Sequence, residues 1–169
     1  MAVLIVIVLS IIFLFGFVVW FGPPYLPTMK LQIETALDLL DLKPGQTMLE
    51  LGSGDGRVLR AGAKRGLNVV GYEINPVLIV LSRLTTWRYR KHVKLVWGDM
   101  WRKDWPPTDG IFTFLLERFM PKLDTKITQT YPGSAVKVAS FAFEMPNKKP
   151  KKEKNGIFLY LYRKNQTKS

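Results

Sequence analysis

The stretch Glu50-Leu51-Gly52-Ser53-Gly54-Asp55-Gly56 decides the fold, because an apolar run passes there into a helical pattern through three alternating glycines. A dinucleotide-binding fingerprint needs GxGxxG, and Arg57 stands where its third glycine belongs. No lysine stands where a phosphate-binding P-loop requires one. Glycines at this spacing let the backbone pass close to a ligand, and Glu50 places a negative charge beneath it. The stretch therefore predicts a site for a cationic ligand.

Apolar runs and helical patterns alternate on both sides of this stretch. Thr28 is suited to cap the first helix. The pattern predicts helices over 29–41, 56–65, 76–90 and 118–130, and strands over 48–52, 68–73, 93–99, 110–116, 134–143 and 156–162. Strands that alternate with helices predict an α/β fold with a mostly parallel sheet. The last strand follows its predecessor without a helix between them, which predicts an antiparallel strand at an edge of the sheet.

Two further carboxylates stand where predicted strands end. Glu73 closes the second strand, 23 residues after Glu50, and Asp99 closes the third. The carboxyl ends of parallel strands form the edge where such sheets bind ligands. Glu73 is placed to accept hydrogen bonds from a pair of ribose hydroxyls, and Asp99 from an exocyclic amine. Each acid alone is typical of a surface turn or a helix cap, but together with the glycines they predict a ligand site.

The composition excludes several classes of chemistry. The chain has 169 residues, no cysteine and a single histidine, His92. Disulfides, thiolate zinc sites, iron–sulfur clusters and cysteine nucleophiles are therefore excluded, and a site with several histidine ligands cannot form. We expect no metal site. The remaining chemistry uses carboxylates, the backbone and a bound cofactor.

The amino-terminal region predicts a membrane anchor. Residues 2–22 carry no charge, and roughly 20 apolar residues are what a helix needs to cross a bilayer. A signal peptide is the alternative, but no basic residue precedes the run and no small-residue cleavage site follows it. We expect a transmembrane helix over 2–22, a Pro-rich connector over 23–28 and one domain over 29–169. Basic residues follow the span, so a single-pass membrane protein is predicted with its domain on the cytoplasmic side, or the matrix side of a mitochondrial membrane.

The positive charge gathers near the carboxyl terminus. Residues 148–169 contain eight basic residues and one acidic residue, out of a net charge of +12. A Lys-rich loop is predicted over 147–155. Such a run is typical of a solvated loop, or it attracts anionic lipid headgroups by about 1 kcal/mol per residue. Nucleic-acid binding is the weaker alternative, because no aromatic residues are interleaved with the lysines.

Three motifs occur in the order ELGSGDG at 50–56, GYEINP at 71–76 and GDM at 98–100. Through them the chain resembles the seven-strand S-adenosylmethionine-dependent methyltransferases. The predicted span followed by PYLPT at 24–28 and SRLTTW at 82–87 is similar to a narrower group. These are membrane-anchored protein-lysine methyltransferases related to the mitochondrial enzymes that act on the c-subunit of ATP synthase and on the adenine nucleotide translocase, with their short prokaryotic relatives. The resemblance covers about residues 10–145.

The resemblance implies a Rossmann-like class I methyltransferase domain, S-adenosyl-L-methionine as cofactor and a lysine amine of a membrane protein as acceptor. The implied cofactor-binding residues are Glu50, Gly52, Ser53, Gly54, Asp55 and Gly56 for the methionine part, Glu73 for the ribose, Asp99 and Met100 for the adenine, and also Asn75 and Thr28. Two departures from the family are visible: no helix precedes the last strand, and residues 141–146 match the expected aromatic and proline ring only loosely.

The acceptor side is predicted from fewer signals. Glu117, just past the fourth strand, is the candidate catalytic residue that orients the incoming ammonium, and capping of the next helix is its alternative role. The resemblance places Tyr25 near the substrate entrance, and Trp101 and Phe143 are candidates for an aromatic wall around a methylated ammonium. Trp101 is equally consistent with a core position.

Two observations bear on other acceptors. Methyltransferases that modify an exocyclic amine of a base carry Asn, Asp or Ser, then Pro-Pro and Tyr or Phe, at the end of the fourth strand. This chain has FLLERFM there, and Asp104-Trp105-Pro106-Pro107-Thr108 precedes that strand, so it is interpreted as a loop and no nucleic-acid partner is expected. Methylation of a small or lipid amine at the membrane surface, and a tethered module that binds the cofactor without transfer, remain open.

Overall fold

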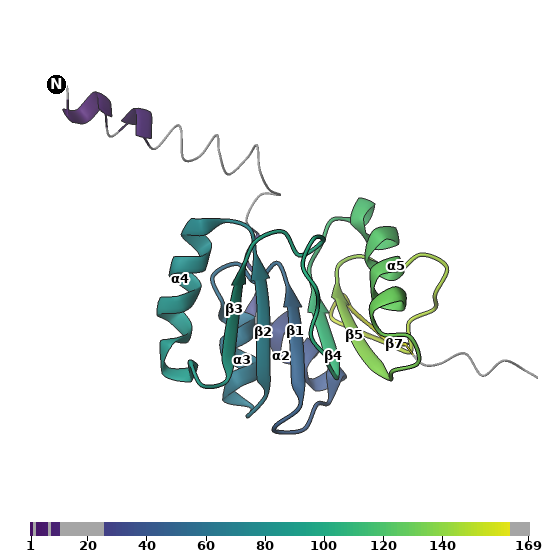
Figure 1. Ribbon diagram of the computed structural model, residues 1–169. Helices are drawn as coiled ribbons and strands as arrows, with labels where there is room; N and C mark the ends of the chain where they lie inside the picture. Colours follow the sequence, from purple (N-terminus) through teal and green to yellow (C-terminus); the bar gives the residue numbers. More distant parts are fainter. Residues whose placement is uncertain (2, 7, 11–25, 163–169) are drawn as a thin grey trace, which may run out of the picture.

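A seven-stranded sheet organises the computed structural model, which describes residues 1, 3–6, 8–10 and 26–162 (Figure 1). The strands are β1 (Thr47–Leu51), β2 (Asn68–Glu73), β3 (Val93–Trp97), β4 (Gly110–Thr113), β5 (Val136–Phe141), β6 (Lys152–Lys154) and β7 (Ile157–Tyr162). Their order in the sheet is β3-β2-β1-β4-β5-β7-β6. The first five strands are parallel, and β7 is antiparallel to β5. The predicted α/β class with a mostly parallel sheet is confirmed.

Helices cover both faces of the sheet. They are α2 (Lys30–Leu40), α3 (Arg57–Lys64), α4 (Pro76–Thr86) and α5 (Met120–Thr130), with short 3₁₀ helices η1 (Trp87–Tyr89) and η2 (Glu117–Phe119). Figure 1 shows α2 and α3 behind the sheet, α5 in front of it and α4 beside the β3 edge.

Strand residues alternate between two apolar clusters, because successive side chains of a strand point to opposite faces. Met48 of β1 packs with α2 and α3 residues such as Leu37 and Leu59. Leu49 and Leu51 pack on the other face, in the cluster that holds Leu123 of α5. Glu50 shares the face of Met48, so the register of β1 directs this carboxylate toward the side covered by α2 and α3.

Helix and strand ends differ from the predictions at several points. Thr28 is not the cap of α2: the N-cap residue is Met29, without a side-chain cap hydrogen bond. The helix predicted over 76–90 is α4 followed by η1. Strand β3 ends at Trp97 because Gly98 has a φ of +137°, and β5 ends at Phe141 because Ala142 has a φ of +69°.

The Lys-rich segment is not wholly a loop, because Lys152–Lys154 form β6 against β7. Strand β6 therefore occupies the sheet edge that was predicted for the last strand. The turn between the two strands is Asn155-Gly156, with φ values of +51° and +73°. Asn-Gly with both residues at positive φ is the preferred two-residue hairpin turn. As predicted, no helix lies between β5 and β7.

The predicted transmembrane helix over 2–22 lies mostly outside the described residues. Residues 3–6 and 8–10 are helical, and Val3 and Leu4 are exposed. Among the helices that the structure describes, none has the length and apolar character needed to cross a membrane. Of the predicted connector, 26–28 are described, and Tyr25 is not.

Candidate functional site

The sheet brings the predicted carboxylates to one edge. Glu50 and Glu73 lie at the carboxyl ends of β1 and β2, which are paired, and Asp99 follows β3 on the other side of β2. The prediction that three acids stand at the ends of three parallel strands is therefore confirmed, with β2 in the middle. The glycine stretch leaves β1 at this same edge.

Backbone hydrogen bonds fix the loop that follows β1. The N–H groups of Gly52 and Ser53 both donate to the Tyr72 carbonyl, at 3.0 and 2.9 Å. The N–H of Gly54 donates to Oε2 of Glu73 at 2.9 Å. Gly52 has a φ of +83°, and apart from its two neighbours in the chain no described residue has an atom within 4 Å of the position that its Cβ would take. The loop thus presents bare backbone to open space at the sheet edge, as a closely approaching ligand requires.

Glu50 is buried beneath this loop with an exposed fraction of 3 %. Its Oε2 has no hydrogen-bond partner among the residues that the structure describes. Burial raises the pKa of Glu50 well above its ordinary value, and the nearby carboxylates of Asp55 and Glu73 raise it further. A buried acceptor without a donor destabilises the fold, and a ligand ammonium group would supply both donor and charge. Glu50 therefore fits the cationic ligand that the sequence predicts.

Ser53 adds a second buried group of the same kind. Its exposed fraction is 3 %, and Oγ has no partner within the described part of the chain. The hydroxyl can donate or accept, so it can pair with either polar end of an amino acid. Its place beside Gly52 is consistent with the predicted contact to the methionine part of a cofactor.

Glu73 holds the loop and retains capacity for a ligand. Its Oε1 accepts from the N–H of Asn75 at 2.8 Å, and its Oε2 accepts from Gly54. Each carboxylate oxygen can accept a second hydrogen bond, so a pair of hydroxyls can still bind. The Asn75 side chain instead caps α4, where Oδ1 accepts from the N–H of Val77 at 2.9 Å. The structure thus gives Asn75 a role in the helix, and its contact with a cofactor stays a prediction.

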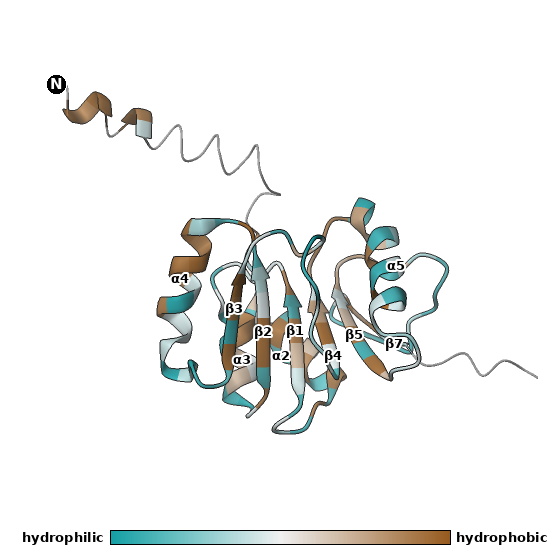
Figure 2. Cartoon of the chain, viewed as in Figure 1, coloured by the Kyte–Doolittle hydropathy of each residue, from teal (hydrophilic) through white to brown (hydrophobic). Residues whose placement is uncertain are grey.

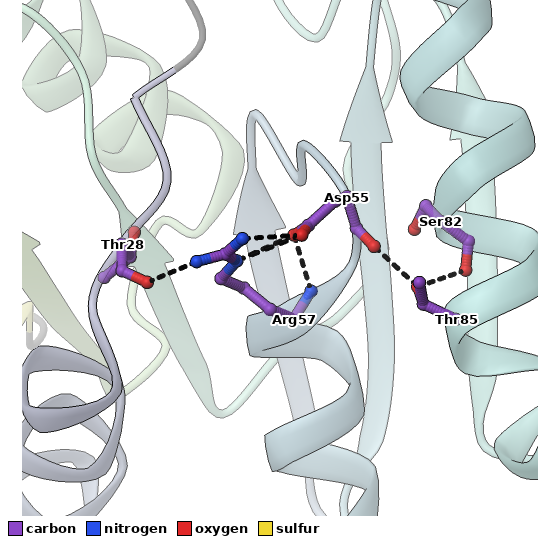
Figure 3. Close-up of polar contacts among 5 residues, drawn as sticks. All are labelled: Thr28, Asp55, Arg57, Ser82 and Thr85. Atoms are coloured by element: carbon purple, nitrogen blue, oxygen red, sulfur yellow. Dashed lines mark hydrogen bonds and ion pairs between the residues drawn. The ribbon is translucent and has the colours of Figure 1, made fainter.

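A hydrogen-bond network ties the loop to its neighbours (Figure 3). Both carboxylate oxygens of Asp55 accept from the Arg57 guanidinium, with Nη2 to Oδ2 at 2.8 Å. Nη1 of Arg57 donates to the Thr28 carbonyl at 3.3 Å, and Oγ1 of Thr85 donates to the Asp55 carbonyl at 2.6 Å. Asp55 therefore connects the segment before α2 with α4, a structural role beside its predicted cofactor contact. Sequence reasoning missed Arg57 and Thr85 as members of the site.

Close packing explains why residue 56 is a glycine. A Cβ at this position would lie 2.3 Å from Oγ of Ser82 and 3.0 Å from Cγ2 of Thr86, and the residue has a φ of +80°. Gly56 is the N-cap residue of α3, so this contact lets α3 begin directly against α4. The glycine thereby sets the distance between two helices, and a cofactor contact stays a prediction.

The predicted adenine-binding residues lie after β3. Oδ1 of Asp99 accepts from the N–H of Trp101 at 2.9 Å, and the side chain is partly exposed. Met100 packs against the cluster under α5, and its carbonyl accepts from Nε1 of Trp105 at 3.0 Å. These bonds shape the 98–105 loop and leave Asp99 with acceptor capacity.

Two of the residues predicted on the acceptor side have packing roles in the structure. Trp101 and Phe143 pack against the α5-side cluster, and Nζ of Lys122 lies 4.6 Å from the centre of the Trp101 ring. Glu117 is exposed at the start of η2, and neither η2 nor α5 has a side-chain cap hydrogen bond. Glu117 therefore makes no such capping bond, and its catalytic role stays a prediction.

Thr113 is a buried polar residue near the carboxyl edge of the sheet that the sequence prediction did not consider. It ends β4 opposite Leu51, is fully buried, and its Oγ1 has no partner among the described residues. A threonine at the carboxyl end of an apolar strand was the available signal, but β-branched residues are common in strands for packing alone.

Solved structures show the same fold. An RNA methyltransferase from Salinibacter ruber, in complex with S-adenosyl-L-homocysteine, is 27% identical with a TM-score of 0.70, and the match covers 81% of this chain and 92% of that chain. A SAM-dependent methyltransferase from Thiobacillus denitrificans is 17% identical with a TM-score of 0.55, covering 73% and 54%. The domain has the class I Rossmann-like methyltransferase fold with a mixed sheet of seven strands.

Curated relatives indicate a narrower class of methyltransferases than the solved structures do. The ATP synthase C-subunit lysine N-methyltransferase of Xenopus laevis is 34% identical over 73% of this chain and 55% of its own length. The adenine nucleotide translocase lysine N-methyltransferase of Mus musculus is 34% identical over 75% and 56%. The chain thus spans about half the length of these relatives. The model of the ANTKMT methyltransferase domain matches residues 50–152, and the chain belongs to this family, whose curated relatives are named lysine N-methyltransferases.

Proposed function

We propose that this protein uses S-adenosyl-L-methionine to methylate a lysine side chain of a membrane protein. The observation that carries the proposal is the buried Oε2 of Glu50, which has no hydrogen-bond partner in the described part of the chain and lies beneath the open backbone of Gly52. The free amino acid end of the cofactor carries an ammonium group, and its ribose carries a hydroxyl pair. Glu50 and Glu73 match these two groups from adjacent strands.

The chain's residues would act mainly by alignment. The cofactor supplies a methyl group on a cationic sulfonium, which is transferred by in-line displacement. Glu50 and Ser53 would bind its amino acid end, and Glu73 its ribose, so that the methyl carbon faces the acceptor. A lysine acceptor has an ordinary pKa of about 10.4 and must lose a proton first, which desolvation promotes. Glu117, exposed at the rim, would orient the ammonium before that loss.

Two observations support a membrane protein as the acceptor. Curated relatives are named for the C-subunit of ATP synthase and for the adenine nucleotide translocase. The apolar run over 2–22 would anchor the domain beside such a substrate, on the cytoplasmic side or the matrix side, and the lysines of 147–155 would add attraction to anionic headgroups. Tyr25, Trp101 and Phe143 would surround the entering lysine.

The proposal is tested by incubating the full chain with methyl-labelled cofactor and native membranes, then separating protein, lipid and RNA. We expect label on lysine in the protein fraction. Glu73→Ala should reduce transfer by tenfold or more, because a charged hydrogen bond contributes about 1.5–3 kcal/mol. Asp38→Ala is the matched control, since Asp38 is exposed on α2 and pairs with Arg65. Label in the lipid fraction would support a lipid amine acceptor instead, and binding without transfer would indicate a non-catalytic module.

RNA is a second candidate acceptor, because the Salinibacter ruber structure is named an RNA methyltransferase. The position of the Pro-Pro pair in this chain disfavours RNA as the acceptor. Residues 104–108 form a loop before β4, in which Trp105 is buried and the Pro106 carbonyl accepts from the Tyr131 hydroxyl at 2.7 Å. The Pro-Pro pair thus precedes β4 and does not lie at the carboxyl end of that strand. Label in the RNA fraction above that in protein would favour this candidate.

A further inference from the structure

The polarity of α4 is reversed relative to an ordinary surface helix. Its buried residues are Ile79, Ser82 and Thr86, two of which are polar. Its exposed side is apolar: the exposed fractions of Val80 and Leu84 are 56 % and 70 %. A helix on a protein surface normally buries its apolar stripe and exposes its polar one. The small polar residues inside are explained by the close contact between Gly56 and Ser82. Within the part of the chain that the structure describes, nothing covers the apolar side chains outside.

These exposed residues form one continuous surface, which we call the α4 face: Val77, Val80, Leu81, Leu84 and Trp87. Their spacing of three and four residues places them on one side of the helix. Ile74 and Trp97 extend the face at its upper end, where Nε1 of Trp97 donates to the Ile74 carbonyl at 3.0 Å. Figure 2 shows the corresponding hydrophobic colour along the upper part of α4.

The charged residues of the chain segment that carries the α4 face have one sign. No Asp or Glu lies between Glu73 and Asp99, whereas Arg83, Arg88, Arg90, Lys91 and Lys94 all fall in this interval and are exposed. The Arg90 guanidinium lies 5.0 Å from the centre of the Trp87 ring. Exposed tryptophans beside arginines and lysines, over an aliphatic surface, are the composition of an interfacial membrane helix.

The α4 face also lies near the start of the described domain. Arg57 links the Thr28 carbonyl to Asp55, and Thr85 of α4 donates to the Asp55 carbonyl (Figure 3). The apolar run that ends at residue 22 is only a few residues before Thr28. Leu26 and Met29, on either side of this link, are exposed as well.

We propose that the α4 face docks onto the surface of an anionic lipid bilayer. The apolar side chains enter the boundary between headgroups and acyl chains, and the five basic residues pair with lipid phosphates or carboxylates. A second copy of the chain is disfavoured as the occupant, because a self-complementary interface would bring two positively charged margins together. The proposal goes beyond the methyl transfer proposed above and does not depend on the acceptor.

The test uses the absence of cysteine from the sequence. Leu84→Cys places a single environment-sensitive fluorophore on the α4 face, and Gln129→Cys places the same label on the exposed side of α5 as the control. Both positions are exposed, so circular dichroism should report an unchanged fold. The full chain is reconstituted in vesicles of phosphatidylcholine with or without phosphatidylserine, each containing a lipid-borne quencher.

We expect the lipid-borne quencher to reduce the emission at position 84 several-fold more than at position 129 in the phosphatidylserine vesicles. The difference should shrink without phosphatidylserine, and also at 1 M salt, where the Debye length falls to about 3 Å. Equal quenching at the two positions in phosphatidylserine vesicles overturns the proposal. A blue-shifted label at position 84 that the lipid-borne quencher does not reach also overturns it, because protein then covers the face.

Discussion

Glu50 couples ligand binding to protonation, because burial raises its pKa and the proposed ligand is a cation. In the free protein the group keeps its proton to a pH above its ordinary pKa of 4.5. Between the ordinary and the raised pKa the folded state binds more protons than the unfolded state, so stability falls as the pH rises through this window. A bound cation favours the carboxylate and lowers the pKa again.

Cofactor binding within this pH window should therefore release protons. Calorimetry in two buffers of different ionisation enthalpy measures that release, which we expect to approach one proton per ligand. Glu50→Gln should abolish the release and flatten the fall of thermal stability with rising pH. Proton uptake on binding by the native protein would contradict the assignment of Glu50 to the cationic end of the ligand.

The sequence predicted those candidate residues of the site whose signal lies in their own type and position. Glu50 and Glu73 are visible because an acid at the end of an apolar strand is unusual, and the glycines because of their spacing. The role of Arg57 was not predictable, because its contact with the Thr28 carbonyl joins positions 29 residues apart. Thr85 was missed for the same reason: its bond to the Asp55 carbonyl depends on how α4 packs beside the loop.

At the scale of elements, α3 and α4 depend on a glycine between them. Gly56→Ala should lose more stability than Gly45→Ala, because both residues have positive φ but only Gly56 lacks room for a Cβ. We expect about 1–2 kcal/mol for the backbone strain at Gly45 and a further 1–3 kcal/mol for overpacking at Gly56. Urea denaturation of the two variants measures the difference. Equal losses would show that α4 yields to the added methyl group without cost.

Some elements could be predicted from side-chain pattern and others could not. Strand β2 was predicted over 68–73, as it is observed, because an apolar run ends at a turn signal on each side. Strand β6 was missed because all three of its residues are exposed and charged. Its backbone pairing with β7 creates the strand, and only the Asn155-Gly156 turn signals it in the sequence. The sequence did not predict which face of α4 is buried. Residues 77–81 are all apolar, so the helix could bury either side of this stretch.

At the scale of the whole molecule, the predicted anchor and the α4 face make separable contributions to membrane attachment. We expect the full chain to stay with membranes through washes with high salt and with alkaline carbonate, because about 20 apolar residues suffice to span a bilayer. A variant without residues 1–25 should still bind anionic membranes, but high salt should release it. Circular dichroism of that variant is the folding control. A product cleaved after the apolar run would show that the segment is a signal peptide.

The strand order has a consequence for synthesis on the ribosome. In β1, Thr47 pairs with Asn68 of β2, 21 residues later, whereas Met48 pairs with Gly110 of β4, 62 residues later. Closing the longer loop costs more chain entropy, and its partner β4 leaves the ribosome after both β2 and β3. The three strands β1, β2 and β3 can therefore assemble cotranslationally while one side of β1 is still unpaired. Until β4 emerges, the nascent chain presents that open strand edge, which exposes this interval of translation to misassembly.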